Sequence, residues 1–172
     1  RLKALHIVPL AISYEYDPCD FLKAKEMQQR RDNPDFHKGP MDDVTSMRTG
    51  IFGYKGSVHY HCAPCIDEYL DTLDPKTPKG VLFETVAKHI DSEIHKNYRL
   101  YPNNFIALDE LLGTDHTGSY TDEDKAAFDS YLGAQLGKID LPNKDEAFLR
   151  NRMLTMYANP AINCLAANGI TA

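Results

Sequence analysis

The chain opens on a short apolar run at residues 7–12, which leads into an aromatic and acidic sequence at residues 14–18. A run this short and apolar predicts a strand that is buried on both faces, as in the parallel sheet of an α/β protein. Pro9 interrupts the run and cannot donate a hydrogen bond to a neighbouring strand. We therefore expect broken pairing there, or a ligand site at the carboxyl end of the strand. Alternation and aromatic content predict a second strand at residues 58–62.

Helical patterns occupy most of the remaining chain. Good helix formers with Asp20 as the expected N-cap predict the first helix. Two later helix starts have the form of capping boxes, one at Thr121 with Asp124 and the other at Asn143 with Glu146. Proline and glycine clusters at 74–80, 101–104 and 159–160 predict interruptions. The predicted helices cover residues 21–31, 42–48, 66–73, 82–98, 121–136 and 143–157.

Two strands are too few for the sheet that the first strand requires. A buried sheet needs more than one hairpin to be stable in water. The sequence therefore predicts additional strands, supplied upstream or by another molecule.

Composition narrows the classes of partner. The chain has 172 residues, is 42% hydrophobic and has a net charge of −6, so one domain with a sizeable core is expected. The acidic balance argues against nucleic acid and against general attraction to anionic lipids. No apolar run approaches the roughly 18 residues that span a bilayer. Four cysteines in a chain of this length predict reduced thiols rather than a disulfide scaffold.

A family resemblance rests on two strings of residues. These are VPLAISYEYDPCDFLKAKEMQQRRDNPDF at residues 8–36 and TGIFGYKGSVHYH at residues 49–61. The first contains an apolar strand with an internal proline, and it resembles the fourth conserved block of the glycerolipid acyltransferases. Together the strings look like a bacterial branch of that family, which includes the 1-acylglycerol-3-phosphate acyltransferases. The resemblance covers most of residues 4–110.

The resemblance implies an α/β fold and a division at the linker. Residues 1–78 would be the C-terminal half of the acyltransferase α/β domain, and residues 79–172 a helical extension packed on it. The family's His-x-x-x-x-Asp and Glu-Gly-Arg-type motifs lie before this block, so we expect no catalytic residue within this chain and no transferase activity from it alone. No metal and no cofactor are implied.

The resemblance also implies partners and a location. The acyl donor would be acyl-CoA or acyl carrier protein, and the acceptor a lysophospholipid-type molecule, at the inner face of the cell membrane. Pro9, Tyr14, Tyr16 and Asp17 would line the substrate pocket at the strand end. A local basic patch could meet the acidic carrier protein or the phosphates of acyl-CoA, although a solvated helix face is the simpler interpretation. The patch comprises Lys23, Lys25, Arg30 and Arg31.

His37 and Asp42 match the spacing of the family's catalytic motif. We interpret this match as coincidental, because it follows the fourth block and no apolar strand leads into it.

A second cluster lies at the second strand, where His59, His61, Cys62 and Cys65 have the spacings of metal ligands. It supports a competing hypothesis, a small zinc-binding module. The Cys-Ala-Pro-Cys sequence before a helix also fits a thiol–disulfide site. A third hypothesis is a noncatalytic interaction module whose binding surface is the helical segment 121–158.

Overall fold

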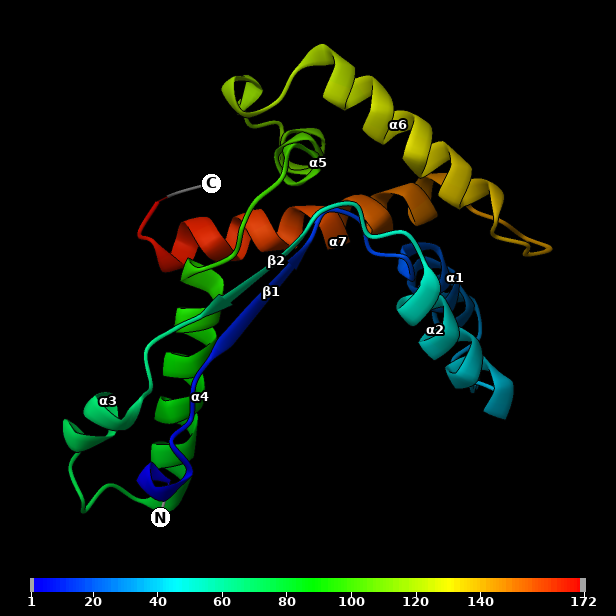
Figure 1. The fold of residues 1–172 in the computed structure, drawn as a ribbon. Coiled ribbons are helices and arrows are strands. Elements are labelled where there is room, and N and C mark those ends of the chain that lie inside the picture. The colour runs from blue at the N-terminus through cyan, green and yellow to red at the C-terminus, as the bar shows by residue number, and fades with distance from the viewer. Residues whose placement is uncertain (1, 171–172) are drawn as a thin grey trace. The chain divides into compact units, whose positions relative to one another are not determined.

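A computed structural model describes residues 2–170, in which helices predominate beside a small antiparallel sheet (Figure 1). This arrangement is a mixed α/β fold, as predicted at that coarse level. In chain order the elements are η1 (Lys3–Leu5), β1 (Leu10–Tyr14), α1 (Asp20–Asp32), α2 (Pro40–Phe52), β2 (Val58–Cys62), α3 (Asp67–Asp71), α4 (Lys79–Lys96), α5 (Pro102–Leu112), η2 (Thr117–Ser119), α6 (Asp122–Gly137) and α7 (Glu146–Ala167).

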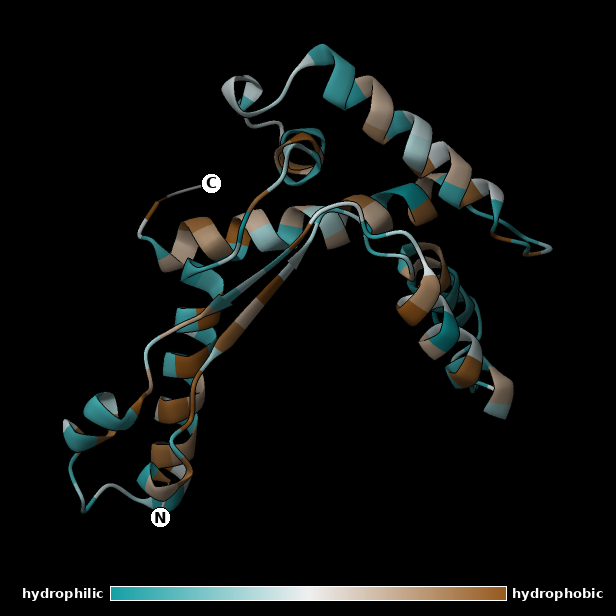
Figure 2. Cartoon of the chain, in the orientation of Figure 1, coloured by the Kyte–Doolittle hydropathy of each residue, from teal (hydrophilic) through white to brown (hydrophobic). Residues whose placement is uncertain are grey.

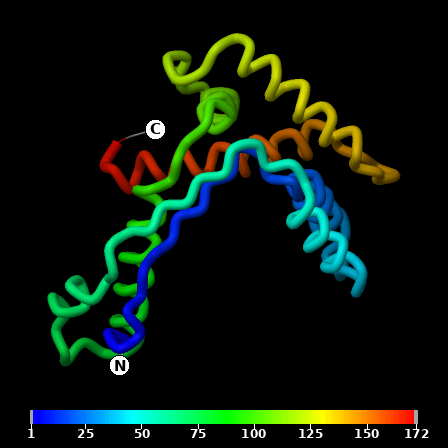
Figure 3. Tube along the Cα trace, viewed as in Figure 1, coloured from blue at the N-terminus to red at the C-terminus, as the bar shows by residue number. Residues whose placement is uncertain are grey.

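The strands β1 and β2 lie side by side (Figure 3). Ala63 N donates to Pro9 O at 2.9 Å, which fixes the register. Ile12 is therefore opposite Tyr60, and Leu10 is opposite Cys62, on one face of the sheet. Ala11 and Ser13 point to the other face and are buried.

The prediction of a first strand buried on both faces is wrong in two respects. β1 begins after Pro9 rather than at Ile7, because a proline at that point lacks the N–H that pairing requires. Its burial alternates, with Leu10 42% exposed and Ile12 39% exposed. Among the described residues its one partner strand is β2, and nothing within residues 2–170 fully covers the Leu10 and Ile12 face.

Contacts within the chain group its residues into two compact units. The first unit contains residues 2–13, 58–99 and 162–170, and the second contains residues 14–57 and 100–161. The predicted division at residue 78 stays a prediction about domain organisation.

The second unit has the larger apolar core. Helix α6 contacts α5 and α1, and the interior is filled by side chains from α5, α6 and α7. Phe128, Leu132, Leu149 and Met153 are each at most 1% exposed. The buried apolar residues of segment 121–158 therefore belong to this core, and the third hypothesis, of an interaction surface on this segment, stays a prediction. By contrast, α2 has no buried residue, and its apolar side chains Met41, Met47 and Phe52 are exposed.

The first unit has a small core made of Ala11, Ala63, Ile66, Val86 and Cys164. Figure 2 shows hydrophobic residues along β1 and α4. The helix predicted at 82–98 is confirmed as α4, in which Val86 is the one buried residue and Phe83 is 58% exposed.

Several helix boundaries differ from the predictions. Thr121 caps α6 as predicted, with Asp124 N donating to Thr121 Oγ1 at 3.1 Å. The expected break at 101–104 instead begins α5, with Pro102 in its first turn, where a missing N–H costs nothing. Helix α7 continues through Pro160 to Ala167 because buried residues on both sides of the proline, including Tyr157, Ala161 and Cys164, keep the helix packed.

None of the helices within residues 2–170 combines the length and apolar character needed to cross a bilayer.

Candidate functional site

The four predicted substrate-binding residues are divided between the two units. Pro9 belongs to the first unit, where it is buried and its carbonyl accepts the hydrogen bond from Ala63 N. Tyr14, Tyr16 and Asp17 belong to the second unit. Tyr14 ends β1 and is 43% exposed, so its ring is open to solvent.

Tyr16 and Asp17 are engaged by their own neighbours. The Tyr16 ring packs against the rings of Tyr131 and Tyr54, with centroids 4.4 and 5.7 Å away. Burial raises the pKa of the Tyr16 hydroxyl. The Asp17 carboxylate accepts from Lys23 Nζ at 2.5 Å and from Cys19 N at 2.9 Å. Of these three second-unit residues, Tyr14 is therefore the one whose side chain is most available to a ligand.

A buried polar cluster lies directly after this segment, at Asp20. Its carboxylate is fully buried, and Oδ2 accepts from Tyr157 Oη at 2.7 Å and Tyr131 Oη at 2.8 Å. Its other oxygen, Oδ1, accepts from Gln135 Nε2 at 2.7 Å and from Phe21 N at 2.5 Å. Four donors therefore satisfy a carboxylate that the sequence predicted only as an N-cap. The N-cap is Cys19.

The electrostatics of this cluster are those of an enclosed network. Burial raises the pKa of Asp20, although the hydrogen bonds from both tyrosines and from Phe21 N oppose the shift. Burial also raises the pKa of Tyr157 and of Tyr131, so both hydroxyls stay protonated as donors. Because every oxygen of Asp20 is engaged and inaccessible, the cluster joins α1 to α6 and α7 rather than binding a substrate.

A histidine–carboxylate pair joins the end of α5 to the loop that follows it. His116 Nδ1 is 2.6 Å from Asp109 Oδ1, and His116 N donates to Asp109 Oδ2 at 2.8 Å. Thr114 and Tyr120 donate to the same carboxylate. Burial would raise the pKa of Asp109, but the bonds from His116, Thr114 and Tyr120 together lower it.

Such a pair is the arrangement that orients a general-base histidine. In this chain it also closes a loop, because the carboxylate gathers three side chains of the segment 114–120. Gly113, with φ of 69°, ends α5 and allows the chain to turn back towards Asp109. The sequence signal that could have revealed this pair is an Asp with a His seven residues later, separated by the glycine that ends the helix.

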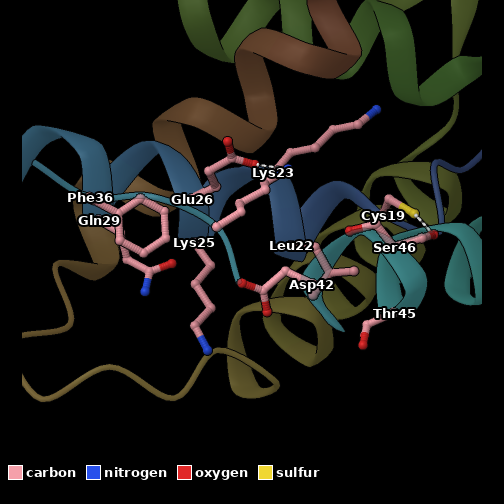
Figure 4. A pocket seen from close by; sticks show the side chains of 11 residues that line it. Cys19, Leu22, Lys23, Lys25, Glu26, Gln29, Phe36, Asp42, Thr45 and Ser46 are labelled. Atoms are coloured by element: carbon pink, nitrogen blue, oxygen red, sulfur yellow. Dashed lines mark hydrogen bonds and ion pairs between the residues drawn. The ribbon is translucent and has the colours of Figure 1, made fainter. Parts of the chain in front are cut away.

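A cleft of about 280 Å³ lies within the second unit, between α1 and α2 (Figure 4). Figure 4 shows Lys25 and Gln29 on α1 and Thr45 and Ser46 on α2 around it. Most of the lining residues are polar or charged, and Leu22 and Phe36 add apolar surface.

The predicted basic patch beside this cleft is largely neutralised within the chain. Lys23 pairs with Asp17, and Arg30 pairs with Glu26 at 2.9 Å. Arg31 contacts both Asp32 and Asp145. Among the four basic residues, Lys25 is the one without an ion pair to another described residue. The patch therefore presents less positive charge to an acidic partner than its sequence suggests.

His37 and Asp42 do not have the setting of a catalytic pair. His37 lies exposed in the loop before α2. Asp42 Oδ2 accepts from Gly39 N at 2.8 Å, so the Asp42 carboxylate binds a free backbone N–H at the start of α2. Helix capping accounts for this aspartate, in agreement with our interpretation of the motif as coincidental.

The predicted metal-ligand cluster does not assemble as the sequence suggested. His59 and His61 lie on the face of β2 opposite to Cys62. Within residues 2–170, one group of three potential ligands converges, formed by His6, Cys65 and Asp67. It takes only Cys65 from the predicted cluster. Cys62 and Cys65 are both free thiols.

Comparison with protein families, with curated proteins and with solved structures finds no match for this chain.

Proposed function

We propose that this chain is the C-terminal portion of a glycerolipid acyltransferase. The enzyme moves an acyl chain from acyl-CoA or acyl carrier protein to a glycerol-phosphate-type lipid acceptor. The proposal begins from the resemblance of residues 8–36 and 49–61. The structural observation that supports it best is the exposed apolar face of the small sheet.

That face is built from alternate residues of β1, from Val8 just before it, and from β2. Val8, Leu10 and Ile12 are 49%, 42% and 39% exposed, and Tyr60 opposite Ile12 is 61% exposed. All four lie in the first unit. A sheet of two strands is marginal in water, and fully burying one such side chain stabilises a protein by roughly 1.5–3 kcal/mol. A larger sheet and its covering layer would bury this face and pair the free strand edges.

The proposal gives this chain a structural and substrate-binding role and places the catalytic base elsewhere in the enzyme. The general base belongs to a His-x-x-x-x-Asp motif elsewhere in the enzyme, and it removes the proton from the acceptor hydroxyl as that oxygen attacks the thioester carbonyl. The ester forms as the thioester C–S bond breaks, and the donor leaves as its thiol after taking up that proton from the base. No covalent acyl-enzyme is part of the proposal. This chain completes the sheet and presents Tyr14 at the end of β1, where ligands of α/β sheets bind.

The test compares the complete product of the gene with the chain of residues 1–172. Each protein is incubated with palmitoyl-CoA and radiolabelled 1-acylglycerol-3-phosphate, and the labelled diacyl product is separated and counted. We expect product from the complete protein and none above background from residues 1–172. Transfer by residues 1–172 alone, or a folded complete protein that is inactive with both acyl-CoA and acyl carrier protein donors, would contradict the proposal.

A variant of the active protein tests the role of Tyr14. Tyr14→Ala should raise KM for the acceptor or donor while the protein stays folded, because the exposed ring contributes contact area to the substrate. Phe52→Ala is the matched control, since the Phe52 ring is 82% exposed in the same unit. Equal effects of the two substitutions would remove Tyr14 from the proposed pocket.

The proposed location is peripheral, at the inner face of the cell membrane, where the lipid acceptor resides. Fractionation of cells that express the complete protein tests this location. Recovery with membranes, and release by high salt or alkaline carbonate, is the expected result.

A further inference from the structure

Three potential metal ligands meet in the first unit, and this convergence does not depend on the acyltransferase proposal. A ring nitrogen of His6, Sγ of Cys65 and a carboxylate oxygen of Asp67 all lie within 4.8 Å of one another. The three residues come from segments about sixty positions apart in the sequence, so the arrangement is created by the fold rather than by local spacing.

Backbone pairing next to the sheet brings the two segments together. Ile66 N donates to Ile7 O at 3.0 Å, which places Cys65 and Asp67 beside His6. His6 follows η1 in the left-handed conformation, with φ of 47°. Lys3 Nζ also contacts the Asp71 carboxylate at 2.6 and 2.7 Å, which joins η1 to α3.

The Asp67 carboxylate is incompletely satisfied. Its Oδ2 is 2.6 Å from His6 Nδ1, whereas its Oδ1 is buried and has no hydrogen-bond partner among the described residues. A buried carboxylate oxygen without a partner costs free energy, and native proteins rarely leave one in that state. A bound cation would supply the missing partner.

We propose that His6, Cys65 and Asp67 form a site for a divalent transition metal, with zinc as the ion that suits them best. Zinc accepts thiolate sulfur, imidazole nitrogen and carboxylate oxygen in one tetrahedral site. Three protein ligands leave the fourth position to water. The ion enters from solvent, because the His6 side chain is 74% exposed while that of Asp67 is 20% exposed.

The proposed ligands differ from the cluster that the sequence suggested, and this difference gives the test its controls. Cys62 lies three residues from Cys65 but is exposed at the end of β2, outside the convergent group. His61 is exposed on β2 in the same way. A site at His6, Cys65 and Asp67 should depend on Cys65 and be indifferent to Cys62 and His61.

The first experiment measures zinc binding to the purified chain. Protein stripped with a chelator is titrated with zinc against a chromophoric competitor. Bound metal is quantified by inductively coupled plasma mass spectrometry. We expect one equivalent. Cys65→Ser and Asp67→Asn should each weaken binding at least about tenfold, since loss even of a residue that merely supports a ligand has effects of that size. Cys62→Ser and His61→Ala should bind as the parent does.

A second measurement needs no variant and therefore does not depend on how a substitution folds. The parent protein is treated with iodoacetamide with and without zinc, and the alkylated cysteines are identified by peptide mass spectrometry. Zinc should protect Cys65 and leave Cys62 reactive. Cobalt(II) should give a thiolate-to-metal absorption band that Cys65→Ser abolishes.

Three results would each overturn the proposal. The parent protein could bind less than one half equivalent of zinc at micromolar concentration, zinc could protect Cys62 and Cys65 equally, or Cys65→Ser could bind zinc as the parent does. Loss of binding in Cys62→Ser or His61→Ala would instead assign the metal to the cluster on β2. The acyltransferase assay is unaffected by either outcome, so the two proposals fail separately.

Discussion

Asp20 connects parts of the second unit that lie more than a hundred residues apart in the sequence. Its hydrogen bonds to Tyr131, Gln135 and Tyr157 cross 111, 115 and 137 positions. Buried hydrogen bonds to a charged group are among the stronger ones, and removing one partner leaves the others unsatisfied. We therefore regard this side chain as a principal determinant of the second unit.

Asp20→Ala should lower the free energy of unfolding by roughly 3 kcal/mol, because two hydroxyls and an amide lose their acceptor in a buried site. Asp20→Asn should cost less, about 1 kcal/mol, since the amide oxygen still accepts and the tyrosine hydroxyls can rotate. Urea unfolding followed by circular dichroism measures both. Asp140→Ala, at an exposed aspartate of the same unit, is the control and should be close to neutral. Equal effects at positions 20 and 140 would contradict the role given to Asp20.

Asp20 and Asp109 should give opposite pH dependences. The pKa of Asp20 is raised in the fold, so the pH-dependent part of its contribution to stability is most favourable below the ordinary value of 3.8 and declines as pH rises through the raised pKa. The pKa of Asp109 is lowered, so its contribution is present above 3.8 and is lost as pH falls towards the lowered pKa.

Unfolding free energies of the parent, Asp20→Asn and Asp109→Asn across a pH series test these signs. The parent should lose stability relative to Asp20→Asn as pH rises above 3.8. It should lose stability relative to Asp109→Asn as pH falls below 3.8. Parallel curves for all three proteins would show that neither carboxyl titrates differently in the fold.

At the scale of elements, α7 is unusual because it contains a proline in its interior. Pro160 has no N–H, so one backbone hydrogen bond of the helix is missing. The proline ring also crowds the backbone carbonyl of the preceding turn. Buried residues on both sides, Tyr157 and Ala161 among them, hold the helix together.

Pro160→Ala should therefore raise the free energy of unfolding by about 1–3 kcal/mol, because it restores the missing bond and a strong helix former. Pro142→Ala is the control. Pro142 lies in the turn before α7. Its replacement should lower the free energy of unfolding by roughly 0.4–1 kcal/mol, because the unfolded chain gains conformational entropy. Thermal or urea unfolding distinguishes the two signs. A neutral Pro160→Ala would indicate that the helix ends at the proline.

The sequence predicted those elements whose signals are local. Thr121 and Asp124 are three residues apart, and the capping box they form begins α6 where expected. Residues 58–62 form the predicted strand with the same bounds. Pro102 and Pro160 were misread because a proline has the same local signature at a break, in a first turn or inside a well-packed helix.

The candidate sites were harder to predict, because their members are distant in sequence. No local pattern links Asp20 to Tyr131 and Tyr157, and Asp20 itself has the signature of an N-cap. Likewise, spacing alone grouped Cys65 with Cys62, whereas the fold places it beside His6 and Asp67. Of the predicted substrate residues, Tyr14 keeps an exposed ring, while Pro9, Tyr16 and Asp17 contact neighbours within their own units.

In the proposed whole enzyme, a further layer covers the face of β1 and β2 that is exposed in this chain. Ile12→Lys should change the stability of residues 1–172 by less than about 1 kcal/mol, because Ile12 is already 39% exposed there. In the complete gene product the same substitution should cost about 3 kcal/mol or more, since the covered sheet would bury an unpaired charge.

Leu5→Lys is the control for both proteins, because Leu5 is 68% exposed and lies outside the sheet. Soluble yield and urea unfolding provide the comparison. Similar effects of Ile12→Lys in the two proteins would mean that no further layer covers this face.

The coding sequence that precedes Arg1 in the source gene would decide whether this chain belongs to an acyltransferase. We expect an open frame that encodes His-x-x-x-x-Asp after an apolar segment, followed by a Glu-Gly-Arg-type motif shortly before Arg1. A start codon at or directly before Arg1 would leave the enzyme without a catalytic base and would contradict the acyltransferase proposal.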